Sequence, residues 1–407
     1  MKVGTMLTKA DTDFLWRALE LAKKGMGHTR PNPPVGAVIV KDGKIIGEGW
    51  HKRAGGDHAE VAAIKNALRK LKHSKTQTLK NCTLYVTLEP CSKPGRVGAC
   101  TDAIIAAGIK RVVYGSVDPN PVNRGRAKHI LSRAGITCEC ANDCDCDELI
   151  APFAKHVRTG LPYVTVKLAM SLDGRICDDF GNARWISSAE SRKMTGKCRE
   201  RVDAIMVGAE TIRRDDPSLL SHGKRNDDLI RVVVTHSGKL PKNAKIFTDG
   251  APNKTRVFRV DRVISSSKGP VVSTDSKGPV VSTDSKGPVV STDSEGPVVS
   301  TDSEGPVVST DSKDPIVAKD LKDVLRQLGK MGVMHVLCEG GLRIARSLAD
   351  AGLVDEWITV LAPVVIGSRP IARTLRGAME IMNDNGCCSY VQDAFAFVNF
   401  KQEYFKE

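Results

Sequence analysis

Short aliphatic runs recur along this chain and constrain its fold more than any other feature. Examples are VGAVIV at 35–40, CTLYVTL at 82–88 and the segment at 229–235. Each run is long enough for a buried strand and well below the ~18 residues that a membrane-spanning helix needs. Helical patterns stand between them, as at Phe14–Lys24, where apolar residues share one face and Gly25 follows. This alternation predicts a layered α/β structure.

Two such α/β series follow one another, separated by TGLP at 159–162. Because 407 residues are enough for two domains, we expect one domain over 8–158 and a second over 159–407. Aromatic residues make up only 4% of the chain. The cores are therefore expected to consist of Val, Ile, Leu and Ala.

A tandem repeat lies inside the second series. The nine-residue unit SKGPVVSTD or SEGPVVSTD occurs five times over 267–311. Gly-Pro in every unit interrupts helices and strands alike, and each unit offers only two valines to a core. A β-roll-like stack is one interpretation, but the composition favours a disordered low-complexity insertion. No catalytic residue is expected there.

The formal net charge of +14 favours anionic partners such as phosphate esters, although a generally lysine-rich composition is the alternative explanation. No Lys/Arg block with interleaved aromatic residues occurs, so nucleic-acid binding is not expected. The N-terminal sequence MKVGTMLTKADTD lacks the apolar stretch of a signal peptide. We therefore expect a cytoplasmic protein without a membrane segment, whose twelve Cys are thiols or metal ligands.

HAE at 58–60, EPC at 89–91 and Cys100 predict a zinc site. One imidazole and two thiolates are a typical ligand set for catalytic zinc, which keeps a further position for water. Zinc acidifies that water, and a carboxylate that is not a ligand can move its proton. Helical positions two apart point in different directions, which suits His58 to the metal and Glu60 to the proton. The alternative is that Cys91 and Cys100 are plain buried thiols and that His58 is a polar residue with its hydrogen bonds satisfied.

H-x-E with P-C-x2-C is typical of zinc nucleobase deaminases, whereas here eight residues separate the two cysteines. This long spacing resembles the deaminase half of the bifunctional riboflavin-biosynthesis deaminase/reductase family, as do PNPPVGAVIV at 31–40, GEGWH at 47–51 and DPNP at 118–121. The sequence SKPGRVGAC stands where that family usually has SHxGRTPPC.

The resemblance implies one zinc ion per chain, held by His58, Cys91 and Cys100. It implies that Glu60 is the catalytic proton donor. It also implies a deaminase substrate site that comprises Asn32, His51, Arg96, Asp118 and Asn120.

The second half has no GxGxxG fingerprint, which disfavours a Rossmann NAD fold. It contains VKLAMSLDGR at 166–175, WIS at 185–187, VGAETIRRDDPSL at 207–219 and LCEGG at 337–341. In the last of these a strand leads through a glycine turn into a helix, whose first backbone N–H groups can bind phosphate. Taken singly, each segment is also compatible with an ordinary turn or loop.

In this order the segments resemble the reductase half of the same family, which has a dihydrofolate-reductase-like fold and uses NADPH. The implied NADPH site comprises Ala169, Trp185, Thr211, Asp215, Gly341, Leu342, Arg343 and Ser347. The implied reductase substrate site comprises Lys167, Ala183, Arg199, Leu219, His222 and Glu339. Ala183 stands where Ser is usual, and His222 stands where Arg, the better phosphate clamp, is usual. Arg225 is a candidate replacement for that contact.

A second cysteine group lies in CECANDCDCDE at 138–148. Cys138, Cys140, Cys144 and Cys146 offer four thiols, but their spacing is not that of a usual zinc finger. Because acidic residues surround them, a solvated loop is favoured over a structural metal site.

The resemblance thus implies an N-terminal cytidine-deaminase-like three-layer α/β/α domain and a C-terminal dihydrofolate-reductase-like α/β domain. We predict zinc-dependent hydrolytic deamination of 2,5-diamino-6-(5-phosphoribosylamino)pyrimidin-4(3H)-one. NADPH-dependent reduction of the ribosyl group would follow and give 5-amino-6-(5-phosphoribitylamino)uracil. The expected partner is this phosphorylated pyrimidine, and a homo-oligomer is expected.

Two alternatives remain open at this point. A deaminase of another base, such as a cytidine nucleotide or tRNA adenosine, leaves residues 160–407 unexplained. A nucleic-acid-binding or scaffold protein with an inactive enzyme fold would have no use for a metal site with a free carboxylate. Consumption of NADPH after deamination distinguishes the predicted enzyme from the first alternative, and release of ammonia distinguishes it from the second.

Overall fold

The computed structural model describes residues 7–72, 78–93, 98–178, 186–221, 229–261 and 315–366, together with three short strands after residue 379. The tandem repeat over 267–311 lies outside the described residues. So do Arg96, Ala183, Trp185, His222 and Arg225. The expectations for these parts of the chain therefore stay predictions.

The first sheet has five strands in the order β2-β1-β3-β4-β5. Its strands are β1 (Gly36–Lys41), β2 (Lys44–Trp50), β3 (Thr83–Leu88), β4 (Arg111–Ser116) and β5 (Thr137–Cys140). β1 pairs antiparallel with β2 and β3, whereas β3, β4 and β5 are parallel. The sheet is therefore mixed.

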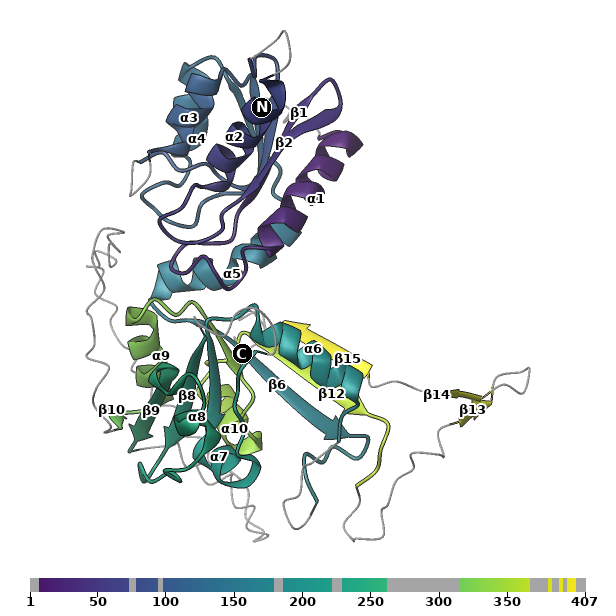
Figure 1. Cartoon of the computed structure of the whole chain (residues 1–407), viewed down its shortest axis with the longest axis vertical. Coiled ribbons are helices and arrows are strands. Elements are labelled where there is room, and N and C mark those ends of the chain that lie inside the picture. Colours follow the sequence, from purple (N-terminus) through teal and green to yellow (C-terminus); the bar gives the residue numbers. More distant parts are fainter. Residues whose placement is uncertain are drawn as a thin grey trace, which may run out of the picture.

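Helices cover both faces of this sheet (Figure 1). One face packs against α1 (Lys9–Lys23), which in turn packs against α5 (Cys144–Thr159). The other face packs against α2 (Ala59–Leu71), α3 (Cys100–Ala107) and α4 (Arg126–Arg133). This arrangement confirms the three-layer α/β/α fold that the resemblance implied.

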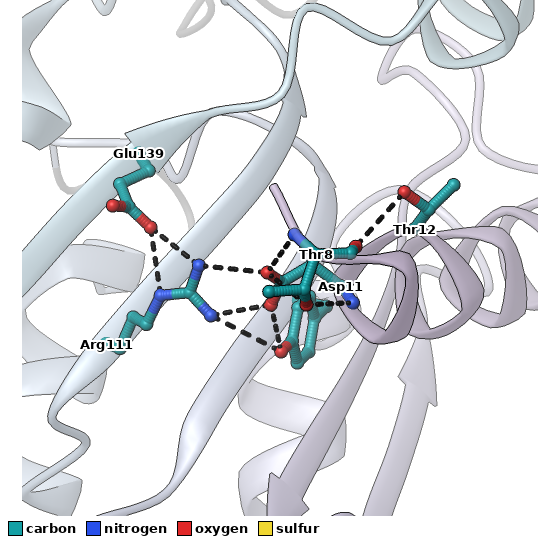
Figure 2. A network of polar contacts seen from close by, with 6 residues as sticks. Thr8, Asp11, Thr12, Arg111 and Glu139 are labelled. Carbon is teal, nitrogen blue, oxygen red and sulfur yellow. Dashed lines mark hydrogen bonds and ion pairs between the residues drawn. The ribbon is translucent and has the colours of Figure 1, made fainter. Parts of the chain in front are cut away.

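One polar network fastens α1 to the sheet (Figure 2). Asp11, in the first turn of α1, is 4% exposed and accepts hydrogen bonds from the Tyr85 hydroxyl and the Arg111 guanidinium, both at 2.6 Å. Thr8 donates to the same carboxylate through its N–H and its hydroxyl, and Arg111 also pairs with Glu139 on β5. Burial raises the pKa of Asp11, but the bonds from Arg111 and Tyr85 outweigh it and leave that pKa well below its usual value. The strands β3 and β4 thereby hold α1 directly, and Glu139 on β5 holds the Arg111 guanidinium.

Helix α5 shows that the interpretation of residues 138–148 as a solvated loop was wrong. Cys138 and Cys140 lie on β5, while Cys144 and Cys146 lie in the first turn of α5. The Asp143 side chain caps this helix by accepting the Cys146 N–H at 2.9 Å. Across the described residues, the four thiols do not form a group at metal-ligand distances. The acidic residues near them cap and charge a helix N-terminus.

The second sheet has eight strands in the order β10-β9-β8-β7-β11-β6-β12-β15. These strands are β6 (Tyr163–Ser171), β7 (Ala204–Gly208), β8 (Ile230–Thr235), β9 (Thr255–Val260), β10 (Ile316–Ala318), β11 (His335–Cys338), β12 (Glu356–Ala362) and β15 (Ala394–Asn399). Neighbouring strands are parallel except β12 and β15, which are antiparallel. The strands β13 (Glu380–Met382) and β14 (Cys388–Tyr390) pair with each other away from this sheet (Figure 1).

Helices again cover both faces. One core contains side chains of α9 (Leu321–Lys330) and α10 (Leu342–Asp350). The opposite core contains side chains of α6 (Ala189–Arg199), α7 (Ala209–Asp215) and α8 (Lys245–Thr248). Both cores consist mainly of Val, Ile, Leu and Ala, as the low aromatic content predicts. Over the described ranges, no helix has the length and apolar character that crossing a membrane requires.

Helix α5 lies between the two sheets and contacts both (Figure 1). Its Lys155 pairs with Asp355 at 2.5 Å, and the Asp355 carboxylate also accepts the Val164 N–H of β6 at 2.7 Å. The boundary predicted between residues 158 and 159 falls at the end of this helix. That boundary remains a prediction.

Gly329 of α9 packs on the backbone where α5 ends. A Cβ at this position would lie 2.0 Å from the Gly160 carbonyl oxygen. Replacing a helical glycine by alanine ordinarily stabilises a protein by roughly 0.5–1 kcal/mol. We expect Gly329→Ala instead to destabilise by about 1–3 kcal/mol, because the added methyl group forces the backbone to shift. Thermal unfolding followed by circular dichroism measures the change.

Gly196 of α6 is the matched control for Gly329. A Cβ at Gly196 would have no neighbour within 4 Å. Gly196→Ala is therefore expected to raise the unfolding temperature, and a similar rise for Gly329→Ala would contradict the close contact with Gly160.

Candidate active sites

Three side chains with metal-ligating atoms meet in the first domain. The Nδ1 atom of His58 lies 3.2 Å from the Sγ atom of Cys100 and 3.5 Å from that of Cys91. The three ligand atoms all lie within 4.8 Å of one another. In the part of the chain that the structure describes, this is the one group of three or more His, Cys, Asp or Glu that is so arranged. These are the residues that HAE, EPC and the following Cys100 predict as metal ligands.

Secondary structure places each of the three at the end of an element. His58 is the N-cap of α2, Cys100 is the first residue of α3, and Cys91 follows β3. The positive ends of two helix dipoles therefore face the thiols and favour their thiolate forms. Gly49 on β2 lets α2 approach closely, because a Cβ there would lie 2.4 Å from a backbone nitrogen of that helix. The Cys100 N–H donates to the Cys91 sulfur at 3.3 Å, which ties the two thiol segments together.

The side chains of this cluster shift one another's pKa values. Hydrogen bonding from Cys100 lowers the pKa of the Cys91 thiol, despite its burial, and His58 lowers it further. Contact with Cys91 raises the pKa of His58. A cluster of two thiols and an imidazole in which one thiol ionises easily fits zinc, which binds deprotonated cysteine. Glu60 is 3% exposed, and burial raises the pKa of its carboxyl group.

His51 and Asn32 lie beside this cluster. His51 is 2% exposed, with its Nδ1 atom 2.9 Å from the Asp57 carbonyl oxygen and its Nε2 atom 3.1 Å from Asn32 Nδ2. Because a carbonyl only accepts, Nδ1 carries the proton and Nε2 accepts from Asn32. The rings of His51 and His58 meet edge to face, with centroids 5.2 Å apart. Burial lowers the pKa of His51, which keeps the ring neutral at physiological pH.

Asp118 and Asn120 lie on the loop that follows β4. Asp118 is 4% exposed and accepts the Asn120 N–H at 2.8 Å. Burial raises the pKa of Asp118 to about 6, and the charge of Cys91 contributes to this rise. Asp118 therefore lies within electrostatic reach of the metal-ligand cluster. Arg96 falls outside the described residues, so its place is not tested.

Two polar residues that join these parts are not among the predicted site residues. One is Glu89, which is 2% exposed and whose carboxylate accepts three backbone N–H groups. Asn123 links the loop after β4 to Ser92. The one signal in the sequence was an acidic residue directly after an aliphatic strand, where a buried carboxylate needs donors.

The second domain contains a largely buried ion pair at its predicted substrate site. Arg199 binds Glu339 through two parallel hydrogen bonds, from Nε to Oε1 and from Nη2 to Oε2, each 2.8 Å long. Arg199 also donates to the Leu220 carbonyl at 3.2 Å, and the neighbouring Leu219 is buried with a φ of 56°. Burial raises the pKa of Glu339, but the charges of Arg199 and Lys167 outweigh it and lower that pKa. The structure thus brings together Lys167, Arg199, Leu219 and Glu339.

Three of the predicted cofactor residues lie near or after the carboxyl ends of β7, β11 and β6, which are neighbours in the sheet. Ala169 lies near the end of β6, Thr211 lies in α7 after β7, and Gly341 is the N-cap of α10 after β11. Because these strands are parallel, their carboxyl ends lie along one edge, where α/β sheets commonly bind ligands.

The remaining predicted cofactor residues differ in their exposure. Leu342 and Arg343 are exposed at the start of α10, and Asp215 is exposed at the end of α7. Ser347 is buried, and its hydroxyl donates to the Arg343 carbonyl at 2.9 Å, so it faces its own helix. The first turn of α10 has no acidic residue and no side-chain cap, which leaves its N–H groups suited to a phosphate.

Both halves of the chain are similar to known proteins. Residues 8–116 match the cytidine and deoxycytidylate deaminase zinc-binding region, and residues 162–394 match the RibD C-terminal domain. The riboflavin biosynthesis protein RibD of Aquifex aeolicus is 35% identical over 367 residues, which cover 89% of each chain. The structure of Acinetobacter baumannii RibD is similar with a TM-score of 0.68 at 31% identity, over 90% of this chain and 94% of that one.

A third comparison concerns a solved structure from Thermotoga maritima. It is described as a diaminohydroxyphosphoribosylaminopyrimidine deaminase/5-amino-6-(5-phosphoribosylamino)uracil reductase. The two structures are similar with a TM-score of 0.67 at 32% identity, over 88% of each chain.

Proposed function

This chain belongs to the RibD family of bifunctional deaminase/reductases of riboflavin biosynthesis, and we propose that its two sites act in succession on one phosphorylated pyrimidine. The first site deaminates 2,5-diamino-6-(5-phosphoribosylamino)pyrimidin-4(3H)-one. The second site reduces the ribosyl group of that product to give 5-amino-6-(5-phosphoribitylamino)uracil. The observation that carries this proposal is the cluster of His58, Cys91 and Cys100 with the buried Glu60 on the same helix entrance.

In the first site, His58, Cys91 and Cys100 would hold a zinc ion, a Lewis acid that lowers the pKa of water. Glu60 is not part of the ligand group, and its raised pKa lets it accept a proton and pass it to the departing ammonia. His51 and Asn32 are fixed to each other beside the cluster and orient the pyrimidine ring. Burial of these groups limits the access of bulk water.

In the second site, the edge formed by β7, β11 and β6 would bind NADPH, which supplies the hydride. The N–H groups at the start of α10 hold a phosphate group, and the exposed Arg343 adds a positive charge there. Lys167 and the Arg199–Glu339 pair bind and orient the open-chain sugar. The net charge of +14 suits a phosphate ester and a dinucleotide phosphate. We also propose that the enzyme is cytoplasmic and forms a homo-oligomer.

The test is to incubate purified protein and zinc with the diaminopyrimidinone, with and without NADPH. Ammonia is expected in both reactions, and NADPH absorbance is expected to fall only once deamination has begun. Ammonia without loss of NADPH would support a deaminase whose second half is inactive. A protein that releases no ammonia contradicts the proposed function.

A further inference from the structure

Glu89 lies between β3 and the Cys91 ligand, and its side chain accepts hydrogen bonds from the loop between β4 and α4. Three backbone N–H groups of the described chain donate to its carboxylate: Asp118 to Oε2 at 3.2 Å, Gly125 to Oε2 at 3.0 Å and Ala127 to Oε1 at 3.1 Å. Hydrogen bonds of this kind offset the loss of water around a buried charge. One carboxylate thus holds both ends of the loop that joins β4 to α4.

Helix α4 depends on Glu89 for its N-terminal cap. Its N-cap residue is Gly125, which has no side chain, and its first turn contains no acidic residue. The Glu89 carboxylate accepts the N–H groups of Gly125 and Ala127 at this end, where the helix dipole favours a negative charge. A residue that follows β3 therefore supplies the cap that the sequence of α4 lacks.

A second contact closes the network into a ring. Asn123 Nδ2 donates to Asp118 at 3.1 Å, and Asn123 Oδ1 accepts from the N–H and the hydroxyl of Ser92 at 3.4 and 3.3 Å. Ser92 directly follows Cys91, whereas Glu89 precedes it by two residues. The segment 89–92 thus holds the loop 118–127 at two points, one on either side of the metal ligand.

The loop carries the two residues expected to meet the substrate, Asp118 and Asn120. The Asn120 N–H donates to Asp118, and the Asn120 Oδ1 accepts the Val122 N–H at 3.1 Å. This second bond orients the amide so that its Nδ2 is the group left to donate to a ligand. Because these internal bonds join the loop into one unit, Glu89 and Asn123 set its place relative to the metal cluster.

We propose that Glu89 is a positioning residue of the deaminase, which fixes Asp118 and Asn120 relative to the cluster of His58, Cys91 and Cys100. The inference rests on the proposed deamination and deepens it, because it names the group that sets the distance between the metal and the amide that recognises the pyrimidine. Glu89 acts through the backbone of the loop and not by contact with the substrate.

Glu89→Gln tests this role, because it keeps the size of the side chain but replaces one acceptor oxygen with an amide NH2 group, which cannot accept a backbone N–H. We expect KM for the diaminopyrimidinone to rise about tenfold or more, with a much smaller change in kcat. Zinc content stays near one per chain, and the KM of the reductase for the deaminated pyrimidine stays unchanged in the same preparation. Hydrogen-exchange mass spectrometry is expected to show faster exchange across 118–127.

Asn123→Ala removes the hydrogen bonds that join Ser92 to Asp118 through Asn123. It is expected to raise the KM for the diaminopyrimidinone by a smaller factor than Glu89→Gln does. Glu139→Gln is the matched control, because Glu139 pairs with Arg111 at the start of β4 whereas the loop follows the end of that strand. It should lower thermal stability and leave the deaminase KM unchanged. The inference is overturned if Glu89→Gln behaves in the same way, with wild-type KM and wild-type exchange across 118–127. Absence of ammonia release from the wild type would contradict the proposed function instead, and the exchange measurement would still decide whether Glu89 holds the loop.

Discussion

Glu60→Gln is expected to release ammonia roughly 10²–10⁴-fold more slowly than the wild type while it retains zinc. The amide keeps the shape of the buried side chain but cannot accept and return a proton. Zinc stays because the ligand group consists of His58, Cys91 and Cys100 and does not include Glu60. Ammonia release and zinc content are measured on the same preparation. NADPH oxidation with the deaminated pyrimidine serves as an internal control for folding, because it uses the other domain.

Glu190→Gln is the matched control for the loss of charge. Glu190 is the second residue of α6 and follows an alanine, as Glu60 does in α2. Both substitutions remove a carboxylate that interacts favourably with a helix dipole, an effect of roughly 0.3–1 kcal/mol. Only Glu60→Gln should affect deamination. Ammonia release at the wild-type rate by Glu60→Gln would rule out the proton-transfer role.

The metal site was predictable because each ligand occupies the end of a local element. HAE lies at the start of the α2 pattern, and EPC directly follows an aliphatic strand, so their surroundings follow from nearby residues. Element types were predictable for the same reason, whereas boundaries were less so. The first helix was predicted over Phe14–Lys24 but begins at Lys9, because a capping box between Thr8 and Asp11 starts it earlier.

Features that join distant segments were not predictable from local pattern. Glu89 and Ala127 are 38 residues apart, and Arg199 and Glu339 are 140 residues apart. The pairing of Arg199 with Glu339 depends on strand order, since β11 lies between β6 and β7 in the sheet although it follows both in the sequence. The contact between Gly329 and Gly160 is equally a result of helix packing. A glycine in a helical pattern gives no sign of what its missing side chain would meet.

Arg199→Met is expected to have the largest effect on the second domain. Arg199 and Glu339 side chains are 17% and 10% exposed, so the substitution leaves a buried carboxylate without its bidentate partner. Breaking such a pair costs about 3–5 kcal/mol of folding stability. We also expect kcat/KM for the deaminated pyrimidine to fall about 10–100-fold, because a charged hydrogen-bonding group at the proposed sugar site is lost. Thermal unfolding and NADPH oxidation measure the two effects, and ammonia release by the first domain should persist.

Lys155→Met is the control that distinguishes a loss of folding stability from a loss of substrate binding in Arg199→Met. Lys155 and Asp355 form an ion pair whose side chains are each 21% exposed, and Asp355 bonds to Val164 near the start of β6. The predicted substrate residues lie toward the carboxyl ends of the strands, at Lys167 on β6 and at Glu339 after β11. Lys155→Met should therefore lower the unfolding temperature and leave KM for the deaminated pyrimidine unchanged. If Arg199→Met also retains the wild-type KM, then Arg199 only stabilises the fold, and recognition of the sugar must come from Lys167 or from residues outside this ion pair.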